Sequence, residues 1–116
     1  MIIKHPQNVP AIDVTMEGAK DVKVRVLLGP ADQAPTFAMR IFELAPGGHT
    51  PYHEHPFEHE VVILSGDIAI VNPEGDKPVH VGDVALIAPM DTHQFKNRSE
   101  RDNASFMCLV PIAYQA

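Results

Sequence analysis

Short apolar runs separated by turns make up most of this chain. Residues 21–28 alternate apolar and charged side chains, as a strand with one buried face does. Residues 105–112 also alternate, with Phe106, Cys108 and Val110 on one face. The other predicted strands are residues 9–16, 36–44, 59–64, 68–71, 78–81, 84–88 and 93–97. No segment shows a sustained helical repeat, so the pattern predicts an all-β protein.

The composition narrows the class of protein. A chain of 116 residues is one domain with enough apolar surface for its own core, and its single cysteine excludes an internal disulfide. The formal net charge is −6 and the basic residues are scattered, which argues against nucleic-acid binding. No run approaches the roughly 18 apolar residues of a membrane span. We therefore expect a cytoplasmic protein that binds neither nucleic acid nor membrane.

Arg40 is an unusual residue for its position. It lies in the run 36–44, which is apolar on both faces apart from Arg40 and Glu43 and therefore predicts a central strand. A guanidinium in such a strand either extends to the edge of the sheet or is paired at a polar site. The sequence leaves both possibilities open.

Three closely spaced histidines are the main chemical feature. His53 and His55 are two residues apart, so in an extended segment both side chains leave the same face. Pro56 then predicts a turn, which lets His59 begin the next strand beside the first pair. The preceding Pro46-Gly47-Gly48 predicts a turn as well. Three imidazoles within seven residues indicate a metal site.

Two spacings in the sequence resemble the motifs of the cupin superfamily. The first covers residues 47–66, from Gly47 through the histidines to Gly66, and the second covers residues 82–97, from Gly82 through His93 to Asn97. The resemblance implies one cupin domain over residues 1–116, with the jelly-roll or double-stranded β-helix barrel of that family. The second motif departs from the usual pattern in loop residues, because Pro89 lies one place further along.

The resemblance also implies a set of metal ligands. His59 occupies the position where most cupins carry a glutamate ligand, and Glu60 is the competing candidate because the family tolerates one more intervening residue. The histidine-rich segment resembles small prokaryotic manganese cupins with four histidine ligands, which here are His53, His55, His59 and His93. The implied cofactor is a divalent ion, manganese by resemblance. Ligand chemistry alone suits iron, zinc, copper or nickel equally well.

The remaining expectations concern the surroundings of the metal. We expect Arg40, Phe95, Phe106 and Cys108 to line a substrate pocket, and Glu60 to support a ligand from the outer shell. No catalytic residue is identified. The leading hypothesis is a metal-dependent oxidoreductase, a dioxygenase or peroxide-using enzyme that acts on a small organic molecule.

Two other functions remain open. One is an isomerase or decarboxylase that uses the metal as a Lewis acid, and the other is a non-catalytic small-molecule-binding cupin. The resemblance and the apolar amino-terminal segment further imply a homodimer.

Overall fold

The computed structural model describes residues 1–115 and consists of antiparallel strands with three short 3₁₀ helices. None of the helices in this range is long or apolar enough to cross a membrane. The strands are β1 (Ile12–Asp13), β2 (Lys20–Leu28), β3 (Phe37–His49), β4 (His59–Ser65), β5 (Ile68–Asn72), β6 (Gly75–Val79), β7 (Val84–Ile87), β8 (Gln94–Asn97) and β9 (Ala104–Pro111). The helices are η1 (Pro6–Asn8), η2 (Pro30–Asp32) and η3 (Ile112–Tyr114).

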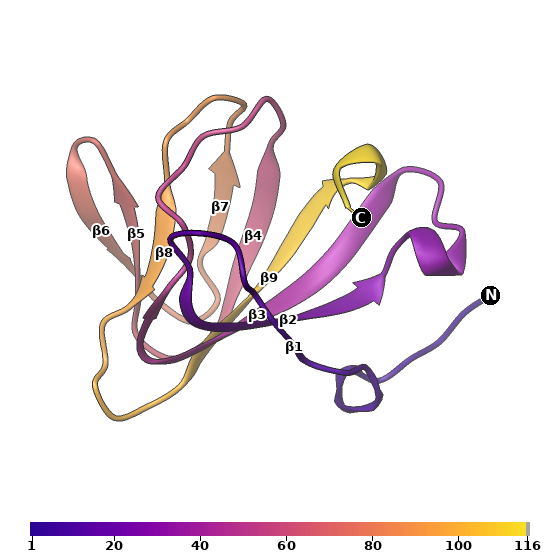
Figure 1. Ribbon diagram of the computed structural model, residues 1–116, viewed down its shortest axis with the longest axis horizontal. Coiled ribbons are helices and arrows are strands. Elements are labelled where there is room, and N and C mark those ends of the chain that lie inside the picture. Colours follow the sequence, from indigo (N-terminus) through magenta and orange to yellow (C-terminus); the bar gives the residue numbers. More distant parts are fainter. Residues whose placement is uncertain (116) are drawn as a thin grey trace.

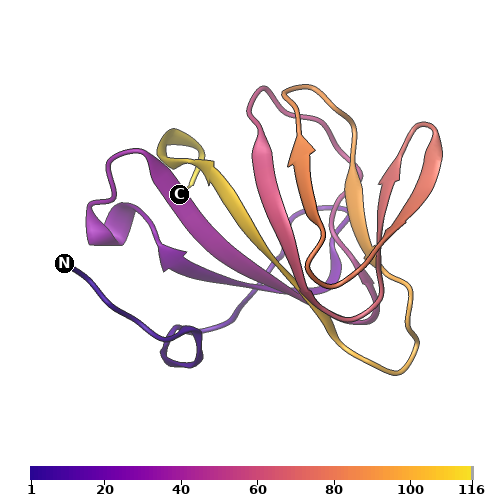
Figure 2. The same ribbon diagram turned by 180° about the vertical axis from the view of Figure 1, so that it is seen from behind.

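The strands form one curled sheet in the order β6-β5-β8-β3-β9-β4-β7, with β2 paired to β3 and β1 to β2. Figure 1 shows the long strands β3 and β9 sweeping across the molecule beneath the upright group β4, β7, β8, β5 and β6. The reverse view shows the same strands enclosing an open-ended half-barrel (Figure 2). The predicted all-β class and its jelly-roll character are confirmed.

Strand β9 supplies the centre of the core. Its residues alternate between buried and half-buried positions, with Phe106, Cys108 and Val110 facing inward as the sequence predicts. Strand β3 pairs with β9 along its first eight residues, and β4 pairs with the other edge of β9. The core therefore lies on the concave face of the sheet, immediately below the histidine segment.

The predicted turn at Pro46-Gly47-Gly48 is wrong, because strand β3 continues through these residues to His49. The pairing of β2 with β3 shifts register here, between Lys20 and Val22. Gly47 has a φ of +72°, which glycine adopts without strain, and a Cβ on Gly48 would lie 2.7 Å from the carbonyl oxygen of Asp21. The glycines thus lie in a bulged, irregular part of the β2–β3 pairing, and the strand continues through them.

The amino-terminal prediction is only partly right. Within the predicted strand 9–16, only Ile12–Asp13 forms strand, and side-chain contacts add to its pairing with β2. Arg25 pairs with Glu43 and donates hydrogen bonds to the carbonyl oxygens of Pro6 and Val9. The chain beyond β1 then crosses to the open end of the half-barrel, where the histidines lie.

Candidate metal centre

The two histidine-bearing segments are fastened to each other through the backbone. The N–H of His53 donates to the carbonyl of His93 at 3.1 Å, and the N–H of His93 donates back to the carbonyl of His53 at 2.9 Å. Nearby, the Thr50 N–H donates to the carbonyl of Phe95 at 2.9 Å, and the Phe95 N–H donates back to the Thr50 hydroxyl at 2.8 Å. This ladder places side chains that are 40 residues apart in the sequence on one site.

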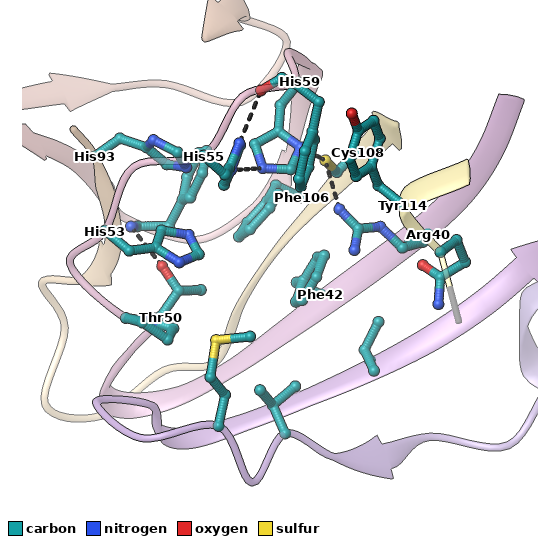
Figure 3. Close-up of a pocket in the computed structure, with 17 residues that line it drawn as sticks. Arg40, Phe42, Thr50, His53, His55, His59, His93, Phe106, Cys108 and Tyr114 are labelled. Atoms are coloured by element: carbon teal, nitrogen blue, oxygen red, sulfur yellow. Dashed lines mark hydrogen bonds between the residues drawn. The ribbon is translucent and has the colours of Figure 1, made fainter. Parts of the chain in front are cut away.

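The four histidines converge at the open end of the half-barrel (Figure 3). Ring nitrogens of His53, His55 and His93 all lie within 4.8 Å of one another. His59 is outside this group of three, but its Nε2 lies 2.8 Å from Nε2 of His55 and its ring centroid lies 5.4 Å from that of His93. Three of the four therefore form a compact set of potential ligands, and the fourth touches it.

Hydrogen bonds fix the orientation of three of these rings. His55 Nδ1 donates to the carbonyl of Phe57 at 2.8 Å, and His93 Nδ1 donates to the carbonyl of Asp91 at 2.7 Å. His59 Nδ1 lies 3.1 Å from the Cys108 sulfur. Because each Nδ1 is engaged, each ring turns its Nε2 toward the common centre, as ligating histidines do.

Glu60 does not take part in this arrangement. His59 is buried at the start of β4, whereas the next residue, Glu60, is exposed and lies on the opposite face of the strand beside Leu109. The outer contact of His59 is therefore a thiol and not the carboxylate expected from the sequence. This geometry makes His59, and not Glu60, the fourth candidate ligand.

Burial favours the neutral form of three of these imidazoles. Desolvation, with smaller contributions from His93 and His55, lowers the pKa of His53 to about 4. Desolvation, followed by the nearby Arg40 charge, lowers the pKa of His59 to about 3. Desolvation also lowers the pKa of His93, although its bond to Asp91 opposes the shift. Neutral imidazoles with available lone pairs are the form that binds metal ions.

A pocket of about 250 Å³ opens beside the histidines. Its walls are mainly apolar, and aromatic rings run in sequence along it: Phe42 stacks on Phe106 at 5.1 Å, and Phe106 stacks on Phe95 at 4.1 Å. Phe95 in turn lies 6.1 Å from the ring of His93. The described residues that line it are Val14, Met16, Val24, Arg40, Phe42, Thr50, Pro51, His53, His55, Phe57, His59, His93, Phe95, Phe106, Cys108, Tyr114 and Gln115.

Arg40 points into this pocket and does not extend to the edge of the sheet (Figure 3). Its Nη2 donates to the Cys108 sulfur at 3.3 Å, and its guanidinium carbon lies 4.8 Å from the centroid of the Phe42 ring. Burial raises the pKa of the Cys108 thiol, while Arg40 acts in the opposite direction. Cys108 is therefore a neutral link between the guanidinium and the ring of His59.

All four residues predicted from the sequence to line a pocket, Arg40, Phe95, Phe106 and Cys108, do line this one. Sequence reasoning missed Phe57 and Tyr114, which stack at 4.2 Å, with Phe57 also stacked on His55 at 3.8 Å. It also missed Phe42, although alternation from Arg40 along the predicted strand places Phe42 on the same face and gives a usable signal.

The chain belongs to the cupin superfamily, because the cupin domain family matches residues 40–110. Among solved structures, it is similar to the polyketide cyclase RemF from Streptomyces resistomycificus, with 31% identity and a TM-score of 0.90 over 97% of this chain and 80% of that one. No curated protein gives a match.

More distant structures share the fold. A predicted oxalate decarboxylase from Thermotoga maritima is 22% identical, with a TM-score of 0.82 over 96% of this chain and 99% of that one. A sugar phosphate isomerase from Silicibacter pomeroyi is 21% identical, with a TM-score of 0.78 over 90% of this chain and 72% of that one. The differing activities named for these proteins agree with the general rule that a fold alone does not fix a reaction.

Proposed function

We propose that this protein is a metal-dependent enzyme that acts on a small organic molecule. The proposed ligands are the Nε2 atoms of His53, His55, His59 and His93, and the proposed substrate site is the adjoining apolar pocket. The observation that carries this proposal is the convergence of three imidazoles, with ring nitrogens within 4.8 Å of one another and a fourth imidazole in contact, at the open end of that pocket.

The spacing of the nitrogens suits a metal ion. Two nitrogens bound at right angles, each about 2.1 Å from an ion, lie about 3 Å apart. The 2.8 Å between Nε2 of His55 and Nε2 of His59 is close to this value. The donor set itself suits zinc, copper, iron or nickel as well as manganese. We propose manganese because the histidine segment resembles that of the four-histidine manganese cupins.

The chain's own residues prepare the site for chemistry. The carbonyls of Phe57 and Asp91 hold two ligand rings in place, and the aromatic walls exclude water from one side. A bound divalent ion would supply Lewis acidity, and manganese, iron or copper would also supply one-electron chemistry. An ion that takes more than four ligands would have room for water or a substrate atom besides the four histidines.

For the type of reaction, we favour Lewis-acid chemistry, such as ring closure or isomerisation of a carbonyl compound. This choice is supported by the similarity to RemF, which is a polyketide cyclase and is matched over almost the whole of this chain. An oxidoreductase, a dioxygenase or peroxide-using enzyme, is the second candidate. It is favoured by the absence of any carboxylate among the described residues that line the pocket, because acid–base chemistry usually employs one.

The test begins with metal content. The untagged protein is purified, analysed for metals, and reconstituted with Mn²⁺ or Zn²⁺, together with a His93→Ala variant and a control variant, His80→Ala, whose exposed ring lies outside the pocket. We expect one ion per chain in the wild type and control, and at least tenfold weaker binding in His93→Ala. An unchanged metal affinity in His93→Ala would refute the proposed ligand set.

The reaction class is tested on the reconstituted protein. Oxygen uptake with apolar carbonyl compounds that depends on manganese or iron would establish the oxidoreductase. Conversion of the same compounds by the zinc form, without oxygen uptake, would establish Lewis-acid chemistry. Electron paramagnetic resonance of the manganese form should change when small anions are added, because the open positions would be accessible to them.

A further inference from the structure

The pocket carries a positive charge that the described part of the protein does not neutralise. Arg40 is the one permanently charged side chain among the described residues that line it. None of the ion pairs within residues 1–115 includes Arg40. Its Nε is buried and has no hydrogen-bond partner in this range. Buried donors of this kind are rare in proteins, and each one calls for an explanation.

The contacts that Arg40 does make are weak ones for a guanidinium. A thiol is a poor hydrogen-bond acceptor, and the distance of 3.3 Å between Nη2 and the Cys108 sulfur is that of a modest interaction. The Phe42 ring offers a cation–π contact. Neither group supplies the negative oxygen that a guanidinium binds most strongly, usually through two parallel N–H bonds.

The positions of Arg40 and the histidines define how a ligand could be oriented in the pocket. Arg40 and the pair His53 and His93 lie on opposite sides of the pocket (Figure 3). The stacked rings of Phe42, Phe106 and Phe95 connect the two sides. A flat molecule lying along these rings would have one end at the guanidinium and the other at the histidines.

We infer that Arg40 binds a negatively charged oxygen of the substrate, and that the substrate class is a flat, largely apolar organic anion, either a carboxylate or an enolate. The aromatic walls suit the apolar body, and Arg40 suits the oxygen. The inference rests on the proposed function only in taking this pocket to be the substrate site. A divalent ion bound by four neutral histidines would add further positive charge and so favour an anion more strongly.

The cavity size limits the substrate. Sites for drug-sized ligands usually have volumes of about 300–1,000 Å³, and this pocket of about 250 Å³ lies just below that range. One or two fused rings are therefore the largest rigid body expected. 2-Naphthoate is a suitable fluorescent probe, with the neutral 2-naphthamide as its uncharged counterpart and the enolate of 1,3-indandione as the second kind of anion.

The experiment measures dissociation constants of the three probes by fluorescence and calorimetry, before and after removal of metal with a chelator. The proteins are the wild type, Arg40→Gln, Arg40→Lys and the surface control Arg98→Gln, which removes the same charge outside the pocket. Hydrogen bonds to charged groups correspond to about 10- to 100-fold in affinity. We expect the wild type to bind at least one anion more tightly than the amide by this factor. The difference should persist after the chelator has removed the metal.

The variants test whether Arg40 causes the preference for anions. The preference should vanish in Arg40→Gln, survive in part in Arg40→Lys, and remain unchanged in Arg98→Gln. The anion that shows the larger loss identifies the oxygen as carboxylate or enolate. Equal binding of anion and amide by the wild type, or a preference that persists in Arg40→Gln, would overturn the inference. If Arg40→Gln fails to fold, the inference is still tested by the binding of anion and amide to the wild type and by the reduced preference expected in Arg40→Lys.

Metal content measured on the same samples separates the two proposals. The hydrogen bond of Arg40 goes to Cys108, and its positive charge lies near His59, so Arg40→Gln should bind metal at least as tightly as the wild type. Wild-type protein that binds no metal but prefers anions through Arg40 would refute the proposed function and leave this inference standing. Wild-type protein that binds metal but shows no preference for anions would refute this inference alone.

Discussion

Lowering the pH from 7.5 to 5.0 should destabilise the metal-free protein, and His59 is one of the residues that cause the loss. In the unfolded chain this imidazole takes up a proton near pH 6.5, whereas in the folded protein its pKa is about 3. Stability is therefore highest above pH 6.5, falls as the pH decreases, and levels off near pH 3. pH 5.0 is 1.5 units below 6.5, and each unit corresponds to about 1.36 kcal/mol, so His59 alone lowers the unfolding free energy by about 2 kcal/mol.

The assay is urea denaturation of chelator-treated protein at both pH values. The chain contains no tryptophan, so far-ultraviolet circular dichroism is the appropriate signal. His53 and His93 shift in the same direction and add to the total loss. Two variants isolate the share of His59: His59→Gln should reduce the loss by about 2 kcal/mol, and His80→Asn, at a ring with 86% exposure, should leave it unchanged.

Two results would refute the reasoning. One is a wild-type unfolding free energy that is the same at pH 5.0 and pH 7.5. The other is a loss in His59→Gln as large as in the wild type, which would mean that burial of this ring does not resist protonation. Asp32 cannot cause this loss of stability. Its pKa is lowered from 3.8, so it changes protonation state below pH 5.0.

Three further predictions concern the ligand choice, the fold and the assembly. Glu60→Gln should leave metal content unchanged, because Glu60 lies on the outer face of β4; loss of metal by elemental analysis would make it a ligand after all. Gly66→Ala should lower the urea unfolding free energy by about 3 kcal/mol, because the residue has a φ of +86° and the new Cβ would lie 2.5 Å from Cβ of Ala104; an unchanged midpoint would contradict this. The protein should be a dimer by light scattering and Leu86→Glu a monomer, because edge strand β7 exposes Val84 by 78% and Leu86 by 67%; a monomeric wild type would contradict it.

Local sequence patterns were sufficient for the fold class and for most strands. The alternation in β9 predicts its inward face, and the spacing of His53 and His55 predicts two side chains on one side. These features depend on the two-residue alternation of side chains along a strand, which can be recognised in a short segment of sequence. The bulge at Gly47 and Gly48 was missed because a glycine pair indicates a turn or a bulge equally well until the partner strand is known.

The contacts around the site depend on residues distant in sequence, and no local pattern contains them. The Cys108 sulfur meets His59 because β9 pairs with β4 across 49 residues of sequence, and the opposite face of β4 carries Glu60 away from the site. Tyr114, which lies in η3 after β9, stacks on Phe57 although the two residues are far apart in the sequence. The sequence therefore predicted the identity of the candidate ligands better than the identity of the groups that support them.

The paired backbone bonds between His53 and His93 also bear on the order of events during folding. The two residues are brought together by sheet closure and not by a local turn, so the compact group of histidines does not exist in the unfolded chain. Pairings between such distant segments form slowly compared with local turns. A metal ion would then bind after the sheet has closed and would chiefly slow its reopening. Excess metal should accordingly lengthen the lifetime of the folded state while leaving the rate of folding almost unchanged.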